Sequence, residues 1–154
     1  MATEDVTLPT TELLVCTTCR PTDAPREGQA AGQTLFEHLE AALAFSDEPS
    51  AASVPRLHGI ACLGACSRSC SVALQAPGKT CYVFGGLAPD DDSVQAVLAV
   101  AQQHAASTDG VLAWAERPQR LRQGLIARLP ALAVPPIPGP ITVPITGPIT
   151  GPSA

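Results

Sequence analysis

Residues 12–19 read ELLVCTTC, in which an apolar run of strand length leads directly into two cysteines. Such a run predicts a β-strand over residues 11–15. Residues 54–61 predict a second strand, and this one leads into cysteines at positions 62, 66 and 70. The sequence therefore places a close pair of cysteines directly after each of two strands. If the strands are neighbours in one sheet, both pairs lie at the same edge.

Helical and extended patterns alternate along the chain. A loop with Pro and Gly over residues 22–33 leads into a helix, in which apolar residues recur at helical spacing over residues 35–43. Residues 76–79 read APGK and predict the turn of a β-hairpin. Three aspartates at residues 90–92 precede another helix, where carboxylates cap free amides and oppose the helix dipole.

A last helix is predicted over residues 118–129. Pro118 suits its first turn, leucines recur at positions 121, 125 and 129, and Pro130 stops it. Arginines at positions 117, 120, 122 and 128 then form a local basic face. The whole pattern predicts an α/β fold, with a mixed sheet of about four strands and helices packed on it.

The sequence divides into four segments. We expect a flexible N-terminal arm at residues 1–10, a metal-binding domain at residues 11–106 and a basic helical extension at residues 107–129. Residues 130–154 carry no charge, hold half of the chain's 16 prolines and repeat the tripeptide Pro-Ile-Thr. We expect them to be a Pro-rich, low-complexity tail with extended, polyproline-like backbone.

Composition excludes several classes of protein. The 154 residues are 45% hydrophobic and 15% charged, which favours a folded domain over a disordered chain. A net charge of -5 argues against a nucleic-acid partner. No apolar run approaches the roughly 20 residues that span a membrane, and the N-terminus lacks signal-peptide features. We therefore expect a cytoplasmic protein, whose six cysteines are metal ligands or redox groups rather than disulfides.

Two close cysteine pairs, far apart in the sequence, are typical of a site with four thiolate ligands. Tetrahedral sulfur ligation suits both zinc and an iron–sulfur cluster, so the spacing alone leaves both open. The predicted ligands are Cys16, Cys19, Cys62 and Cys66.

The residues around the pairs favour a cluster. Gly59 and Gly64 let backbone amides approach closely, while Arg20 and Arg68 each follow a pair. A 2Fe–2S cluster with four thiolates carries net negative charge, so amides and arginines stabilise it and tune its potential. A buried structural zinc needs such groups less.

The other cysteines and the histidines have alternative interpretations. Cys70 lies one helical turn beyond Cys66 and competes with Cys19 for the fourth ligand position. Cys81, within a predicted strand, is interpreted as a packed small hydrophobic residue. A metal-free dithiol at the first pair is a further hypothesis, although it does not require a second pair. Surface or satisfied structural roles are expected for the histidines at positions 38, 58 and 104.

The ligand segments resemble a known family. VCTTC at residues 15–19 and CLGAC at residues 62–66 are similar to the ligand segments of thioredoxin-like 2Fe–2S ferredoxins, including the small cluster-carrying subunit of NADH dehydrogenase. YVFGGLAP at residues 82–89, followed by acidic residues and a helix, resembles their closing strand, turn and helix. The resemblance covers about residues 11–106 and implies a thioredoxin-like fold. In those ferredoxins the first pair is more widely spaced, and Cys70 has no usual counterpart.

The chain as a whole is similar to a bacterial domain-of-unknown-function family of predicted metal-binding proteins. VCTTCR at residues 15–20, CLGACSR at residues 62–68 and WAERP at residues 114–118 carry this similarity. Members often accompany cobalamin-biosynthesis genes, so the resemblance implies a link to that pathway.

We therefore predict a small 2Fe–2S electron carrier with a protein redox partner and with neither a nucleic-acid nor a membrane partner. A homodimer is left open. We expect no catalysis by the chain alone, because no nucleophile, base and orienting group occur together. The alternatives are a zinc or cobalt carrier or sensor that uses the same cysteines, and a binding module with a structural zinc.

Overall fold

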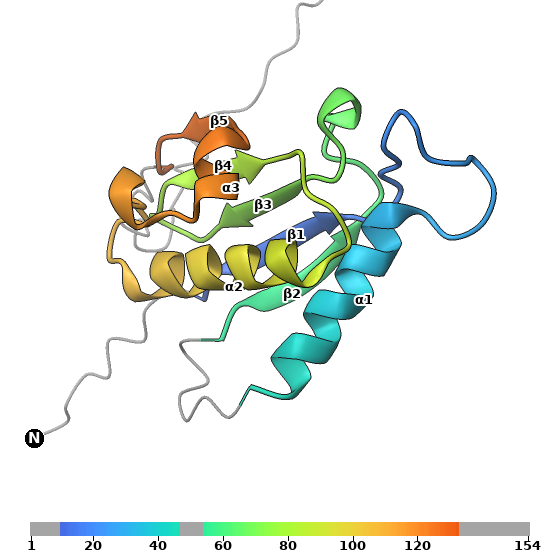
Figure 1. Cartoon of the computed structure of the whole chain (residues 1–154). Helices are drawn as coiled ribbons and strands as arrows, with labels where there is room; N and C mark the ends of the chain where they lie inside the picture. Colours follow the sequence, from blue (N-terminus) through green and yellow to red (C-terminus); the bar gives the residue numbers. More distant parts are fainter. Residues whose placement is uncertain (1–9, 47–53, 133–154) are drawn as a thin grey trace, which may run out of the picture.

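The computed structural model describes residues 10–46 and 54–132. Its centre is a mixed five-stranded sheet in the order β2-β1-β3-β4-β5 (Figure 1). Strands β1 and β2 are parallel, and every other neighbouring pair is antiparallel. The strands are β1 (Glu12–Cys16), β2 (Arg56–Ile60), β3 (Val72–Gln75), β4 (Cys81–Phe84) and β5 (Leu125–Leu129).

Two long helices pack on one face of this sheet (Figure 1). They are α1 (Ala31–Ala44) and α2 (Asp91–Ala106). The register of the strands brings Leu13, Leu74 and Tyr82 side by side on that face, and all three are fully buried. Alternate residues of β1, β3 and β4 therefore form a single hydrophobic core with the apolar faces of α1 and α2.

The order of the elements confirms the expected thioredoxin-like α/β fold. β1, α1 and β2 form a parallel β-α-β unit, and the β3–β4 hairpin followed by α2 completes the four-stranded arrangement. The aspartates before α2 cap it as predicted, because the Asp90 carboxylate accepts a hydrogen bond of 2.8 Å from the Ser93 amide. The N-terminal arm and the Pro-rich tail from residue 133 onward lie outside the described residues.

The predicted helix over residues 118–129 is wrong in its second half. Only α3 (Gln119–Gln123) is helical, and Leu125 to Leu129 form the fifth strand of the sheet. Gly124 lies so close to Gly85 that a Cβ atom there would be 2.6 Å from the Gly85 carbonyl oxygen. The Gly85 amide donates a 2.8 Å hydrogen bond to the Gly124 carbonyl, so the chain leaves the helix to pair with β4.

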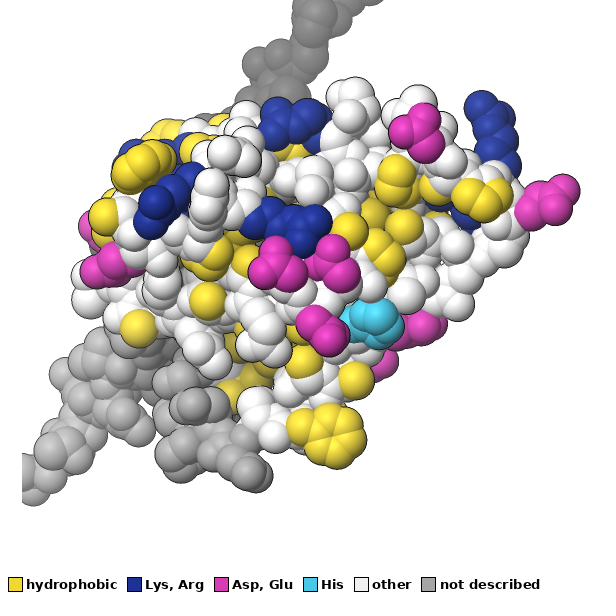
Figure 2. Space-filling model, in the orientation of Figure 1, with side chains coloured by type: hydrophobic (Ala, Val, Ile, Leu, Met, Phe, Trp, Pro, Cys, Tyr) yellow, Lys and Arg dark blue, Asp and Glu magenta, His cyan; other side chains and the backbone are white. Residues whose placement is uncertain are grey.

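The four arginines of this region do not form one basic helix face. Arg120 bridges the carboxylates of Asp90 and Asp92, with N–O distances of 3.0 Å, where basic and acidic side chains adjoin near the start of α2 (Figure 2). Arg122 lies 4.7 Å from the ring centre of Trp114. The other two, Arg117 and Arg128, lie over the ring of Tyr82.

Two short 3₁₀ helices complete the described structure, η1 (Cys66–Arg68) and η2 (Trp114–Glu116). Within residues 10–46 and 54–132, no helix combines the length and apolar character that crossing a membrane requires.

Candidate metal centre

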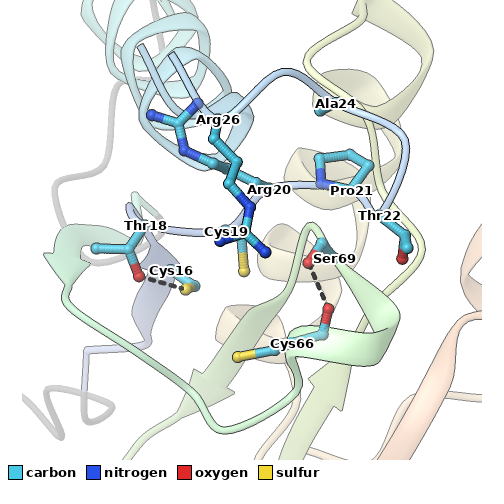
Figure 3. A pocket seen from close by; sticks show the side chains of 10 residues that line it. All are labelled: Cys16, Thr18, Cys19, Arg20, Pro21, Thr22, Ala24, Arg26, Cys66 and Ser69. Carbon is cyan, nitrogen blue, oxygen red and sulfur yellow. Dashed lines mark hydrogen bonds between the residues drawn. The ribbon is translucent and has the colours of Figure 1, made fainter. Parts of the chain in front are cut away.

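The end of β1 and the loop that follows it form one side of a cavity of about 490 Å³, and the segment around η1 forms the other. Cys16, Cys19 and Cys66 line this cavity (Figure 3). Because β1 and β2 are parallel neighbours, the loops that follow them lie at the same edge of the sheet, as the sequence predicted. The fold therefore brings together cysteines from both predicted pairs.

The loop of the first pair is tied to the end of β2. Thr17 donates to the Ile60 carbonyl through its amide, at 2.9 Å, and through its hydroxyl, at 3.1 Å. The Thr18 hydroxyl donates to the Ala61 carbonyl. These hydrogen bonds hold the first cysteine loop against the segment that leads into Cys62.

Helix α1 begins directly against the same loop. The Gly32 amide donates a 3.0 Å hydrogen bond to the Cys19 carbonyl. A Cβ atom at Gly32 would lie 2.0 Å from the Cys16 carbonyl oxygen, a distance that no side chain tolerates. Glycine at this position therefore allows the first turn of α1 to hold both cysteines of the pair.

In the second pair, Cys62 lies in the loop after β2 and Cys66 is the first residue of η1, and both are exposed. Gly64 has a φ of +74°, which favours glycine, and its amide donates to the Cys62 sulfur at 3.1 Å. The predicted approach of a backbone amide at Gly64 is thus present. The Ser69 hydroxyl donates a 2.7 Å hydrogen bond to the Cys66 carbonyl and closes the turn (Figure 3).

The two thiols of the first pair influence each other. Burial raises the pKa of Cys16, but hydrogen bonds from the Cys19 thiol, the Thr18 hydroxyl and the Leu63 amide outweigh burial and lower that pKa below its ordinary value. Burial is also the main reason that the pKa of Cys19 is raised, and the Cys16 thiol adds to the effect. The pair therefore combines one thiol with a lowered pKa and one with a raised pKa.

The two thiols of the second pair also influence each other. The neighbouring Cys62 thiol is the main reason that the pKa of Cys66 is raised, and the charge of Cys16 contributes across the cavity. Within each pair the two thiols are thus neighbours, and Cys16 and Cys66 interact electrostatically between the pairs. No three Cys, His, Asp or Glu side chains in the described ranges are grouped closely enough to hold one metal ion.

Cys70 lies deeper than the other cysteines of this region. It is completely buried and does not line the cavity. Its amide donates a hydrogen bond to the Leu87 carbonyl, and its carbonyl accepts one from the Leu87 amide. Burial, with the charges of Cys19 and Cys16, raises the pKa of its thiol to about 11. Cys70 lies near the first pair, and its role as the alternative fourth ligand stays a prediction.

The predicted tuning arginines contact backbone carbonyls. Arg20 donates to the carbonyls of Pro25, at 3.0 Å, and of Gly28, and so closes the loop that leads into α1. Arg68 donates to the Gln123 carbonyl at 3.3 Å, which links η1 to the end of α3. Both arginines hold the ligand loops in place, and their effect on a bound cluster stays a prediction.

Arg26 was missed by the sequence analysis. It lines the cavity, and Figure 3 shows its side chain pointing from the loop into the cavity on the side of Cys19. Only the arginines that closely follow a cysteine pair, Arg20 and Arg68, were predicted to act on the site. The sequence signal that could have identified Arg26 is a basic residue within the loop that joins the first cysteine pair to α1.

The remaining cysteine and the histidines lie away from the cavity. Cys81 pairs with Leu129 in the sheet and lines a different hollow, near the β3–β4 turn. The predicted structural role of His104 is confirmed, because its buried ring contacts the Thr11 hydroxyl at 2.8 Å and the Thr80 carbonyl at 2.7 Å. His38 and His58 lie on the surface.

Two solved structures are similar to the chain. One is a thioredoxin-like [2Fe-2S] ferredoxin from Aquifex aeolicus, with 14% identity, 78% of this chain and 93% of that chain covered, and a TM-score of 0.48. The other is a 1.5 Å crystal structure of the wild-type thioredoxin-like [2Fe-2S] ferredoxin from Aquifex aeolicus, with 14% identity, 77% and 98% covered, and a TM-score of 0.46.

A comparison with curated proteins found no match. The family model described as "Protein of unknown function (DUF1636)" matches residues 13–131, which are most of the chain and include all six cysteines. The chain therefore belongs to the DUF1636 family.

Proposed function

We propose that this protein binds a 2Fe–2S cluster through Cys16, Cys19, Cys62 and Cys66 and acts as a small one-electron carrier. The observation that supports this most strongly is the arrangement of the thiols, because Cys16, Cys19 and Cys66 line one cavity and Cys62 lies beside Cys66. A 2Fe–2S cluster takes four thiolates, two at each iron, so two facing pairs supply the required donors.

The backbone around the thiols suits an anionic cluster. The Gly64 amide donates to the Cys62 sulfur at 3.1 Å, and the Leu63 amide helps to lower the pKa of Cys16. Hydrogen bonds to ligand sulfurs stabilise negative charge on them and tune the reduction potential. When bound, the cluster accepts and releases one electron, and the chain's own residues hold and orient it.

The difference in exposure between the pairs favours one side for electron exchange. Cys16 and Cys19 are buried under α1, whereas Cys62 and Cys66 are exposed. We propose that a protein redox partner docks over the exposed second pair. The cytoplasmic setting, the absence of a nucleic-acid partner and the link to cobalamin biosynthesis belong to the same proposal.

Metal and sulfide analysis of anaerobically purified protein tests the proposal. We expect about two irons and two acid-labile sulfides per chain and visible absorption that dithionite bleaches. Cys62→Ser and Cys66→Ser each remove most of the iron and lower the melting temperature, because metal binding by a thiolate site contributes to folding. Cys81→Ser is the matched control and keeps full iron.

Zinc or cobalt bound without sulfide would overturn the cluster proposal and favour the metal carrier or sensor that uses the same thiols. Full retention of iron in both serine variants would show that the second pair is not the site. A colourless, metal-free protein would overturn the cluster proposal and favour metal-free dithiol chemistry at the first pair.

A further inference from the structure

We propose that Arg26 sets the reduction potential of this centre, by holding an unpaired positive charge over the cavity beside Cys19. The inference rests on the proposed cluster function and assigns a role to a residue in the loop between the first cysteine pair and α1. The positive charge of Arg26 acts on the centre through space.

The loop that carries Arg26 is held in a defined shape. The Arg20 guanidinium donates to the carbonyl of Pro25, immediately before Arg26, and to those of Glu27, at 3.5 Å, and Gly28, after it. The Ala24 amide donates to the Pro21 carbonyl at 2.9 Å. Hydrogen bonds from Arg20 thus hold the backbone on both sides of Arg26. The folded loop therefore fixes the position of Arg26.

The Arg26 guanidinium has no competing partner among the described residues. The ion pairs found there join Glu12 to His58, and Arg120 to Asp90 and Asp92. Neither these pairs nor the hydrogen bonds of the described chain involve the Arg26 side chain. Because no carboxylate lines the cavity either, the charge of Arg26 is not neutralised at the site.

Reduction of a four-thiolate 2Fe–2S cluster adds one electron to a group that is already negative. A cation nearby stabilises the reduced form more than the oxidised form, so it raises the reduction potential. The chain's net charge of -5 acts in the opposite direction. Since Arg26 is exposed, its contribution decreases as added salt screens it.

Arg26→Gln and Arg26→Lys test this inference, with Arg56→Gln as the matched control. Arg56 is an exposed arginine at the start of β2, the end of the strand away from the cysteines. Iron and sulfide are measured first, and the midpoint potential is then determined by dithionite titration at low and high salt. We expect Arg26→Gln to shift the potential to a more negative value, by an amount that decreases with salt. Arg26→Lys and Arg56→Gln keep potentials near that of the wild type.

The other outcomes separate the inference from the function on which it rests. Wild-type protein without iron and sulfide would overturn the cluster function and this inference together. A loaded Arg26→Gln protein with the wild-type potential would overturn this inference alone. An Arg26→Gln protein that no longer takes up the cluster would overturn the tuning role and indicate that Arg26 acts in cluster assembly. A shift in Arg26→Lys equal to that in Arg26→Gln would show that the planar guanidinium, rather than the charge, matters.

Discussion

Cys19 and Cys70 are both buried near Cys16, yet only Cys19 lines the cavity. Cys19 follows Cys16 within one turn of the chain, and its carbonyl is held by the first turn of α1. Cys70 lies behind this pair, and its amide and carbonyl are both used by Leu87. Cys19 as the fourth ligand stays a prediction, and its place at the cavity is what supports it over Cys70.

Serine substitutions distinguish the two cysteines. Cys19→Ser changes the visible and electron-paramagnetic spectra of the cluster or abolishes them, because an oxygen ligand replaces a thiolate. Cys70→Ser leaves the spectra intact, and Cys70→Ala controls for the cost of a buried hydroxyl. Spectra are the preferred measurement, since serine can weaken a site without emptying it. Loss of the cluster in Cys70→Ser and an unaltered spectrum in Cys19→Ser would make the ligand set Cys16, Cys62, Cys66 and Cys70.

At the scale of elements, two buried side chains fasten the C-terminal end of α2 to the sheet. The Lys79 ammonium donates to the carbonyls of His104 and Ala105, both at 2.9 Å, and so caps the last turn of the helix. The His104 ring accepts from the Thr11 hydroxyl and donates to the Thr80 carbonyl, which fits the neutral imidazole. These contacts join α2 to the start of β1 and to the strand that follows the hairpin turn.

His104 makes stability depend on pH. Burial, together with the nearby charge of Lys79, lowers the pKa of His104 below its ordinary value, although the hydrogen bond to Thr80 opposes the shift. As the pH falls below about 6.5, the unfolded chain binds a proton at this histidine before the folded chain does, so the free energy of unfolding decreases. Urea unfolding between about pH 5.5 and 7.5 measures this slope.

His104→Gln removes the titrating group and reduces the slope, at a cost of about 1 to 3 kcal/mol from weakened buried hydrogen bonds. His38→Gln, at an exposed position on α1, is the control for the loss of a histidine outside this buried site. An unchanged slope in His104→Gln would mean that other groups account for the pH dependence.

At the scale of the whole molecule, the described chain ends at the exposed Leu132, close to the β3–β4 turn. The uncharged, Pro-rich sequence that follows has no helical periodicity and is predicted to bury little surface. Deletion of residues 137–154 should therefore leave iron content and melting temperature unchanged, as measured by metal analysis and thermal unfolding. A decrease of more than about 4 °C, which corresponds to about 1 kcal/mol, would show that Ile137, Ile141 and Ile145 dock on the domain.

The sequence by itself determined the β-α-β unit, the hairpin, the capped α2 and the two cysteine pairs at one sheet edge. These features depend on local patterns: apolar runs, turn residues, caps and ligand spacing. The approach of the Gly64 amide to the Cys62 sulfur was also predictable, because glycine readily adopts the backbone conformation that directs this amide at the sulfur.

Only the tertiary structure decided the fifth strand, the roles of the arginines and the burial of Cys70. Leu121, Leu125 and Leu129 suit a helix, but alternate residues from Leu125 also suit a strand, and the free edge of β4 selects the strand. The contacts of Arg20 and the free charge of Arg26 depend on how a loop folds back on itself, which periodicity does not report. Local interactions are encoded by neighbouring residues, whereas pairing across the fold depends on which surfaces the remaining chain leaves available.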